Sequence, residues 1–100
     1  GWDAHWGTPA YLSGHPFLTA AAAKHLVDRG AALVGIDSLN IDDIGDGARP
    51  VHSVLLGAGI PIVEHLCNLR ALPDRGFRFS AVPARVAGFG SWPVRAFAEV

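Results

Sequence analysis

The spacing of apolar side chains divides the first half of the chain into a loop, a helix and a strand. Residues 20–29 place their apolar side chains on one face at helical spacing, behind Thr19 as an N-terminal cap and ahead of Gly30 as a stop. The apolar run 31–36 predicts a strand buried on both faces. A helix that leads directly into such a strand is typical of α/β proteins.

A second helix and strand follow the same order. Pro50 suits the first turn of a helix whose apolar residues again recur at helical spacing. Residues 60–63 predict a strand, which Pro61 restricts to the edge or end of a sheet because proline cannot donate to a ladder. Residues 65–72 predict a helical turn.

The last quarter of the chain has the two-residue period of half-buried strands. Residues 77–81 and 94–98 alternate between apolar and polar side chains, which predicts an antiparallel pair. The whole pattern predicts an α/β fold with a mixed sheet and a few helices. At 100 residues, the chain forms one domain or part of one.

Composition excludes several classes of partner. The formal net charge is −1 without any run of Lys or Arg, so we expect no nucleic-acid partner and no anionic membrane partner. The longest apolar run, 54–63, is shorter than the roughly 18 to 20 residues that cross a bilayer, and no signal peptide is visible. Cys67 is the only cysteine, which favours a reducing compartment. We therefore expect a cytoplasmic protein in which Cys67 is a small buried apolar group.

The first 16 residues are expected to form an ordered loop that is rich in aromatic and histidine side chains, glycine and proline. Five ring-bearing side chains are expected to gather there: Trp2, His5, Trp6, Tyr11 and His15. Aromatic loops often form the wall of an apolar pocket, although such rings can equally cover the edge of a core. The chain begins Gly-Trp-Asp and has no methionine, so we expect a processed product or a fragment.

Two residues have the chemistry of metal ligands at the ends of predicted elements. His52 lies early in the second helix, and Glu64 follows the strand 60–63 directly. Both are expected to be substantially buried, and a buried carboxylate is costly unless it is paired or bound to a cation. Two ligands do not complete a metal site. Motifs such as HExxH, paired CxxC, a glycine-rich phosphate loop or GxSxG are absent.

Other polar residues follow the first predicted strand. Asp37 stands at its carboxyl end, a frequent site position in α/β sheets. We expect Asp37 to support a metal ligand through hydrogen bonding. Asn40, Asp42 and Asp43 are explained equally well as turn residues.

Three segments carry a resemblance to a known family. They read AAAKHLVDRGAALVGIDSLNID, VHSVLLGAGIPIVEHLCNLRALPDRGFRF and VPARVAGFGSWPVRAFA, and GWDAHWG precedes them. The motifs VH, a short helix, G-x-G-I, VE and NL follow one another in this order. Through these motifs and the flanking segments, nearly the whole chain resembles the C-terminal half of the cyclase superfamily. That family includes bacterial kynurenine formamidase, isatin hydrolase and polyketide cyclases.

The resemblance implies part of a swivelling β/β/α domain, with residues 1–100 as the C-terminal portion of a single domain. It also implies a divalent cation, zinc or manganese, bound by an N-terminal HxGTHxDxPxHF motif that this chain lacks and by a His and a Glu that match His52 and Glu64. Trp2 and Trp6 then become candidates for the wall that binds a small aromatic amide substrate. We expect a homo-oligomer.

His65 stands where the family has asparagine. It could act as an extra ligand or base, but a surface position is favoured because neighbouring strand residues point to opposite faces. The predicted function is that of a metal-dependent amide hydrolase acting on an aryl formamide or cyclic amide, with metal-activated water as nucleophile. The alternatives are a non-catalytic fragment or degenerate paralogue that packs and oligomerises, and a polyketide cyclase.

Overall fold

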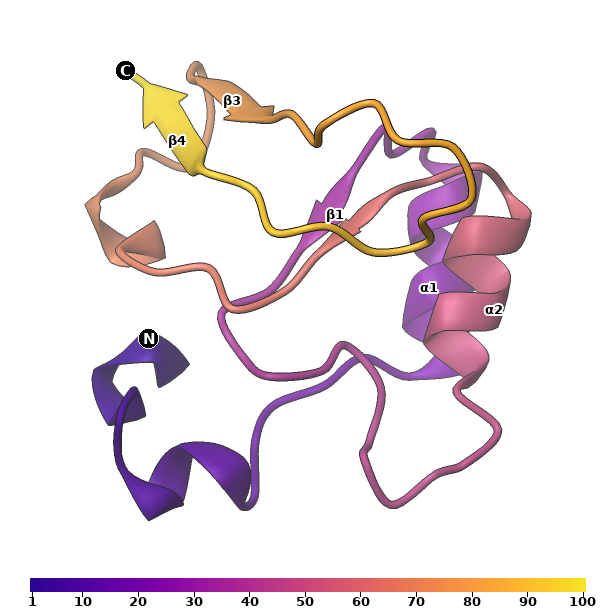
Figure 1. The fold of residues 1–100 in the computed structure, drawn as a ribbon, viewed down its shortest axis with the longest axis horizontal. Coiled ribbons are helices and arrows are strands. Elements are labelled where there is room, and N and C mark those ends of the chain that lie inside the picture. The colour runs from indigo at the N-terminus through magenta and orange to yellow at the C-terminus, as the bar shows by residue number, and fades with distance from the viewer. The chain divides into compact units, whose positions relative to one another are not determined.

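The computed structural model describes residues 1–100 and consists of two units, Gly1–Cys67 and Asn68–Val100 (Figure 1). The first unit holds both α-helices and a parallel pair of strands, and the second holds an antiparallel pair. The elements in chain order are η1 (Trp2–His5), η2 (Pro9–Leu12), α1 (Ala20–Asp28), β1 (Val34–Gly35), α2 (Pro50–Gly57), β2 (Ile62–Val63), η3 (Leu69–Ala71), β3 (Arg78–Ala81) and β4 (Ala96–Glu99). The predicted α/β class is confirmed, and the strands form two separate small sheets, one parallel and one antiparallel.

Helix α1 begins and ends where its sequence predicts. The Thr19 hydroxyl accepts a hydrogen bond from the amide of Ala22 at 3.1 Å, which satisfies a donor that the first turn leaves free. Gly30 has φ +72°, the left-handed conformation that glycine adopts without a steric penalty. His25 is exposed on the polar face, as expected.

Helix α2 lies beside α1, and the core of the first unit forms where they meet the strands (Figure 1). Pro50 occupies the first turn of α2, and Val51 and Leu55 are fully buried one turn apart. Burying a large aliphatic side chain of this kind contributes about 1.5–3 kcal/mol. The buried apolar residues of this core are Ala23, Val34, Ile41, Val51, Leu55 and Ile60.

Strands β1 and β2 pair in parallel, with Val34 opposite Ile62 and Gly35 opposite Val63. Each strand is only two residues long, so the strand expected over 31–36 is shorter than predicted. Val34 packs in the core while its neighbour Gly35 is exposed, so the expected burial on both faces is wrong: only one face of β1 is covered. Parallel pairing brings the residues after both strands to the same edge.

The second unit contains the predicted antiparallel pair. Strand β3 pairs with β4, with Arg78 opposite Glu99 and Ala81 opposite Ala96. The helical turn expected over 65–72 is confined to the short helix η3. No helix of the chain is long and apolar enough to cross a membrane.

Cys67, the last residue of the first unit, is exposed. The expectation that it would be buried is wrong, because the chain has already left β2 and follows an irregular path outside the core by this point.

Candidate functional site

His52 is held at the start of α2 by a buried carboxylate. Asp42 Oδ1 accepts a hydrogen bond from the Val51 amide at 2.7 Å, and Oδ2 accepts one from the His52 amide at 3.0 Å. The same Oδ2 lies 2.6 Å from Nδ1 of the His52 ring. Asp42 is 1% exposed. This carboxylate therefore caps the first turn of α2 and orients the imidazole.

Asp42 is thus more than the turn residue predicted from the sequence. Burial alone would raise the pKa of its carboxyl, but the hydrogen bonds from His52 and from the Val51 amide outweigh burial and lower the pKa below the usual 3.8. Arg49 turns the chain into the helix with φ +46°, an uncommon conformation for a side chain other than glycine. That turn brings the helix amides to Asp42.

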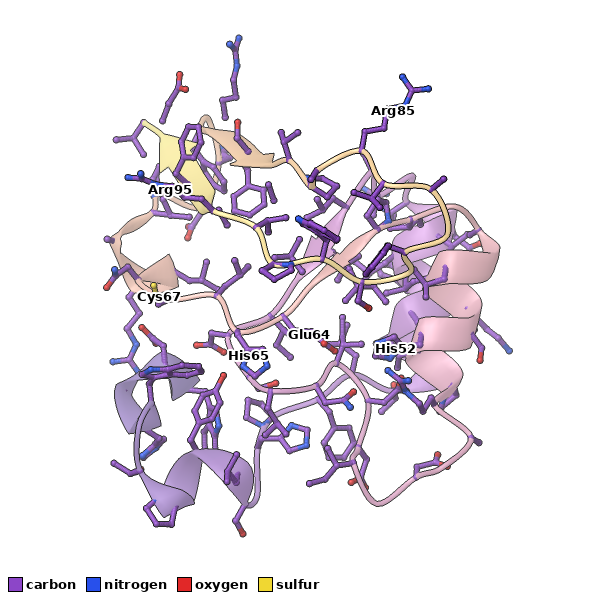
Figure 2. The ribbon with its side chains drawn as sticks, in the orientation of Figure 1. His52, Glu64, His65, Cys67, Arg85 and Arg95 are labelled. Carbon is purple, nitrogen blue, oxygen red and sulfur yellow. The ribbon has the colours of Figure 1, made fainter.

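The structure brings His52 and Glu64 together. His52 Nε2 lies 3.5 Å from Glu64 Oε1, and the two side chains are 16% and 25% exposed (Figure 2). The amide of Ile41 donates to Glu64 Oε1 at 2.8 Å, which fixes the carboxylate beside α2. Both side chains are partly buried, less than the sequence pattern suggested.

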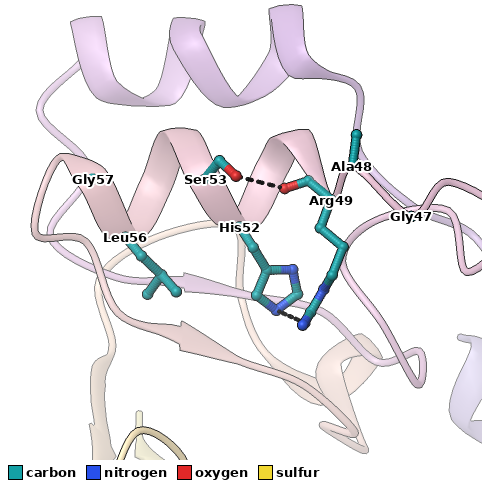
Figure 3. A pocket seen from close by; sticks show the side chains of 7 residues that line it. All are labelled: Gly47, Ala48, Arg49, His52, Ser53, Leu56 and Gly57. Carbon is teal, nitrogen blue, oxygen red and sulfur yellow. Dashed lines mark hydrogen bonds between the residues drawn. The ribbon is translucent and has the colours of Figure 1, made fainter.

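An open hollow of about 610 Å³ lies along the exposed side of α2 (Figure 3). Its lining residues are Gly47, Ala48, Arg49, His52, Ser53, Leu56 and Gly57. Within it, Nη2 of Arg49 lies 2.8 Å from Nε2 of His52. The outward nitrogen of His52 therefore lies beside the hollow and accepts a hydrogen bond from Arg49.

The donor atoms fit part of a divalent metal site. An imidazole nitrogen and a carboxylate oxygen are ordinary zinc ligands, and His52 and Glu64 direct such atoms toward each other. No group of three or more His, Cys, Asp or Glu side chains in this chain could hold a metal ion. Asp42 cannot serve as the third ligand here, because it is buried behind the Nδ1 side of the ring. Two such donors do not complete a metal site, so the metal role of the pair stays a prediction.

The ring-bearing loop is ordered by its own contacts. The Trp2 and His5 rings lie 4.6 Å apart, and the Trp6 and Tyr11 rings 5.1 Å apart. Trp2 Nε1 donates to the carbonyl of Tyr11 at 3.1 Å. The two short helices η1 and η2 were not predicted. His15 is buried and packs beside Phe17 instead of joining the other rings.

His65 is exposed, as predicted, but it has specific partners that the sequence did not reveal. The Tyr11 hydroxyl lies 2.8 Å from His65 Nδ1, and the two rings stack at 5.8 Å with an angle of 27°. The Trp6 ring meets His65 edge-on at 5.7 Å. His65 has φ +57°, so the alternation of strand side chains no longer applies to it. A contact that spans 54 residues leaves no signal in local spacing.

Burial raises the pKa of the Tyr11 hydroxyl, and the carboxylates of Asp37, Asp3 and Glu64 raise it further. Tyr11 is therefore a neutral hydrogen-bonding group at the edge of the loop. Tyr11 as a residue is 4% exposed, while the neighbouring Trp6 is 66% exposed.

Asp37 anchors the start of the chain. Its Oδ2 accepts hydrogen bonds from the nitrogen of Gly1 at 2.6 Å and the amide of Trp2 at 2.7 Å. Burial opposes ionisation, but these bonds prevail and lower the pKa of the carboxyl. The partners of Asp37 belong to the loop, so the expectation that it supports a metal ligand stays a prediction.

Comparison with known proteins identifies relatives of one kind. The profile of the Cyclase family, described as "Putative cyclase", matches residues 1–43. A kynurenine formamidase of Bacillus cytotoxicus is 32% identical over 81 residues, which are 81% of this chain and 38% of that protein. A kynurenine formamidase of Paracidovorax citrulli is 32% identical over 73 residues, 73% of this chain and 33% of that protein. No solved structure matches significantly.

The matched relatives are longer than this chain, which covers 33% and 38% of the two proteins above. A third, a kynurenine formamidase of Bacillus thuringiensis, is 31% identical over 81% of this chain and 38% of its own length. The family profile covers the first part of the chain, and the formamidase relatives align over 73–81% of it. The chain is similar to the cyclase superfamily and spans 33–38% of the length of these relatives.

Proposed function

We propose that the protein containing this chain is a metal-dependent hydrolase of the arylformamidase type, acting on an aryl formamide or a cyclic amide. The observation that carries the proposal is the approach of His52 Nε2 to Glu64 Oε1, at 3.5 Å, beside an open hollow. The relatives named kynurenine formamidase support an amide as substrate. Because the chain spans only part of their length, the activity is assigned to the whole protein.

In this proposal, His52 and Glu64 would hold a zinc or manganese ion together with ligands from outside the pair. When bound, such an ion lowers the pKa of water and polarises a carbonyl group. The Asp42 carboxylate holds the His52 ring at the start of α2, and the backbone amide of Ile41 holds the Glu64 carboxylate, so a contact from outside the pair positions each side chain.

The loop of residues 1–16 would bind the aromatic part of the substrate. Trp6 is largely exposed, and its ring is fixed by Tyr11 and His65 at its edges. Trp2 is tied to the same loop through its indole nitrogen. An exposed ring held by its neighbours offers apolar area at little cost in conformational entropy. We further propose that the intact fold is the swivelling β/β/α domain and that the protein is a homo-oligomer.

Substitution of both ligand residues tests the proposal. In the natural full-length protein, His52→Ala and Glu64→Ala should each lower kcat/KM for N-formyl aryl amines by more than about 100-fold, because even the partners of metal ligands contribute 10–100-fold. Bound zinc and manganese, measured by elemental analysis, should fall in parallel. His25→Ala, on the exposed face of α1, is the matched control. Full activity in both variants would refute the proposal.

The non-catalytic alternative has one observation in its favour, the absence of a group of three or more ligands in this chain. It predicts that the natural protein binds no stoichiometric metal and does not hydrolyse formyl aryl amines. Tight metal binding with turnover would exclude it.

A further inference from the structure

We propose that strand β4 is an interface between copies of this chain, in which the free edge of β4 pairs antiparallel with the same edge of a second copy. The pairing is centred on Phe97, which lies opposite its own counterpart. The inference supplies a surface for the homo-oligomer proposed above and is independent of the metal site.

The outer edge of β4 has no strand beside it. Strands β3 and β4 form a sheet of two strands, so each has one neighbour and one free edge. No backbone hydrogen bond outside that pair involves a residue beyond Leu72. A two-stranded sheet is marginally stable on its own, and free edges accept strands from other chains. The edge of β4 is therefore open for pairing.

The side chains of β4 and the residue before it alternate between an exposed face and a half-buried face. Arg95, Phe97 and Glu99 are exposed, and Phe97 retains 49% of its surface. Ala96 and Ala98 between them are half-buried. An exposed apolar side chain on a free edge favours association with another strand.

The charges on the exposed face are arranged symmetrically about Phe97. Arg95 lies two residues before it, and Glu99 lies two residues after it. When two copies of β4 run antiparallel with Phe97 at the centre, Arg95 of each copy lies opposite Glu99 of the other. The two phenylalanine rings then meet between two pairs of opposite charge. Aromatic pairs and opposite-charge pairs across strands both stabilise a sheet.

The antiparallel register centred on Phe97 is the one that matches the charges. A shift by one residue in either direction places Arg95 and Glu99 opposite alanine or valine. Parallel pairing in register places like charges opposite each other, which is destabilising. In the antiparallel register, Val94 also faces Val100, whose side chain is 87% exposed. A second copy of the chain therefore matches β4 on both faces.

The free edge of β3 does not offer the same match. Its strand carries Arg78 and no acidic residue, so a second copy of β3 would bring no opposite charge. Pro83 follows two residues after the strand and lacks the N–H that a ladder requires. We therefore assign the interface to β4.

Charge reversal tests the pairing. In the natural full-length protein, Arg95→Glu brings two acidic side chains together at each end of the interface. We expect the dimer dissociation constant, measured by analytical ultracentrifugation at low ionic strength, to rise by about tenfold or more. Arg85→Glu is the matched control, because Arg85 is an exposed arginine on the loop after β3 (Figure 2), and it should leave the dissociation constant unchanged. Circular dichroism verifies that both variants are folded.

A second variant reverses the other charge. Glu99→Arg is combined with Arg78→Glu, because Arg78 lies opposite Glu99 within the sheet and the exchange keeps opposite charges there. This variant should dimerise as weakly as Arg95→Glu. When the two variants are mixed, they should form a heterodimer, since acidic side chains of one chain then face arginines of the other. Native mass spectrometry with one chain ¹⁵N-labelled distinguishes the heterodimer from both homodimers.

A monomeric wild-type protein would overturn both this interface and the proposed homo-oligomer. An oligomer with the same dissociation constant in Arg95→Glu and Arg85→Glu would overturn the interface alone. Mixed variants that form no heterodimer would also overturn it and would indicate that the edge of β4 pairs with another part of the natural protein. Formation of the heterodimer supports the antiparallel pairing. The hydrolase proposal is tested separately, by the activity and metal content of the His52 and Glu64 variants.

Discussion

Removal of the Asp42 side chain should destabilise the protein far more than removal of its neighbour. Asp42→Ala deletes the acceptor of two amide hydrogen bonds at the start of α2 and of the contact with the His52 ring. Loss of a helix cap costs about 0.5–2 kcal/mol, and leaving a buried donor without an acceptor costs about 1–3 kcal/mol. Because part of these terms describes the same bonds, we expect a total of about 2–4 kcal/mol.

The assay is urea unfolding of the natural full-length protein at pH 7, with free energies from the midpoint and the slope. Asp43→Ala is the matched control, because Asp43 is exposed and accepts a single amide bond from Gly45. It should change the free energy of unfolding by less than about 0.5 kcal/mol. Equal midpoints for the two variants would refute the role of Asp42 as the cap of α2.

The stability difference between the wild type and Asp42→Ala should depend on pH. The pKa of Asp42 is lower in the folded protein than its ordinary value, so the folded state favours the ionised carboxylate. Its contribution should be complete above about pH 5 and should disappear as the pH falls through the folded pKa, below about 4. The stability difference between wild type and Asp42→Ala should therefore shrink in acid. A difference that grew below pH 4 would contradict the reasoning.

Substitutions at three further positions test other parts of the first unit. Tyr11→Phe removes the hydroxyl that lies 2.8 Å from His65 Nδ1 and leaves the ring in place. The free energy of unfolding in urea should fall by about 1 kcal/mol. An unchanged free energy would mean that the contact does not contribute to stability. Gly35→Ala places a Cβ 2.6 Å from Leu66 Cδ1, a side-chain atom that can rotate away, so thermal unfolding should show a loss of about 1 kcal/mol. Thr19→Ala should lose about 1 kcal/mol of helix capping, whereas Thr19→Ser should keep it; equal stability of the two variants would exclude the cap.

Local signals in the sequence were sufficient for the two α-helices and their starts. Thr19, Gly30 and Pro50 each act within one turn of helix, so a short window contains all that decides the boundary. The sequence pattern located His52 at the start of the second helix and Glu64 directly after the second strand. The short distance between the two side chains depends on how the residues between them fold.

Contacts between distant segments could not be predicted in the same way. Asp42 reaches the start of α2 across a loop whose path depends on the unusual backbone conformation of Arg49. The contact between Tyr11 and His65 requires the first loop to return to the end of β2. The predicted length of β1 was too great, because an apolar run does not show how many of its residues will pair with another strand.

The separations of these contacts along the chain imply an order of assembly. Asp42 and the His52 ring are 10 residues apart, whereas Ile41 and Glu64 are 23 apart, and β1 and β2 must close a long crossover before they pair. Short loops close faster and at lower entropic cost than long ones. The imidazole can therefore be oriented by its carboxylate early in folding, and Glu64 arrives only when the parallel strands meet. On this order, the orientation of His52 precedes the arrival of Glu64 beside it.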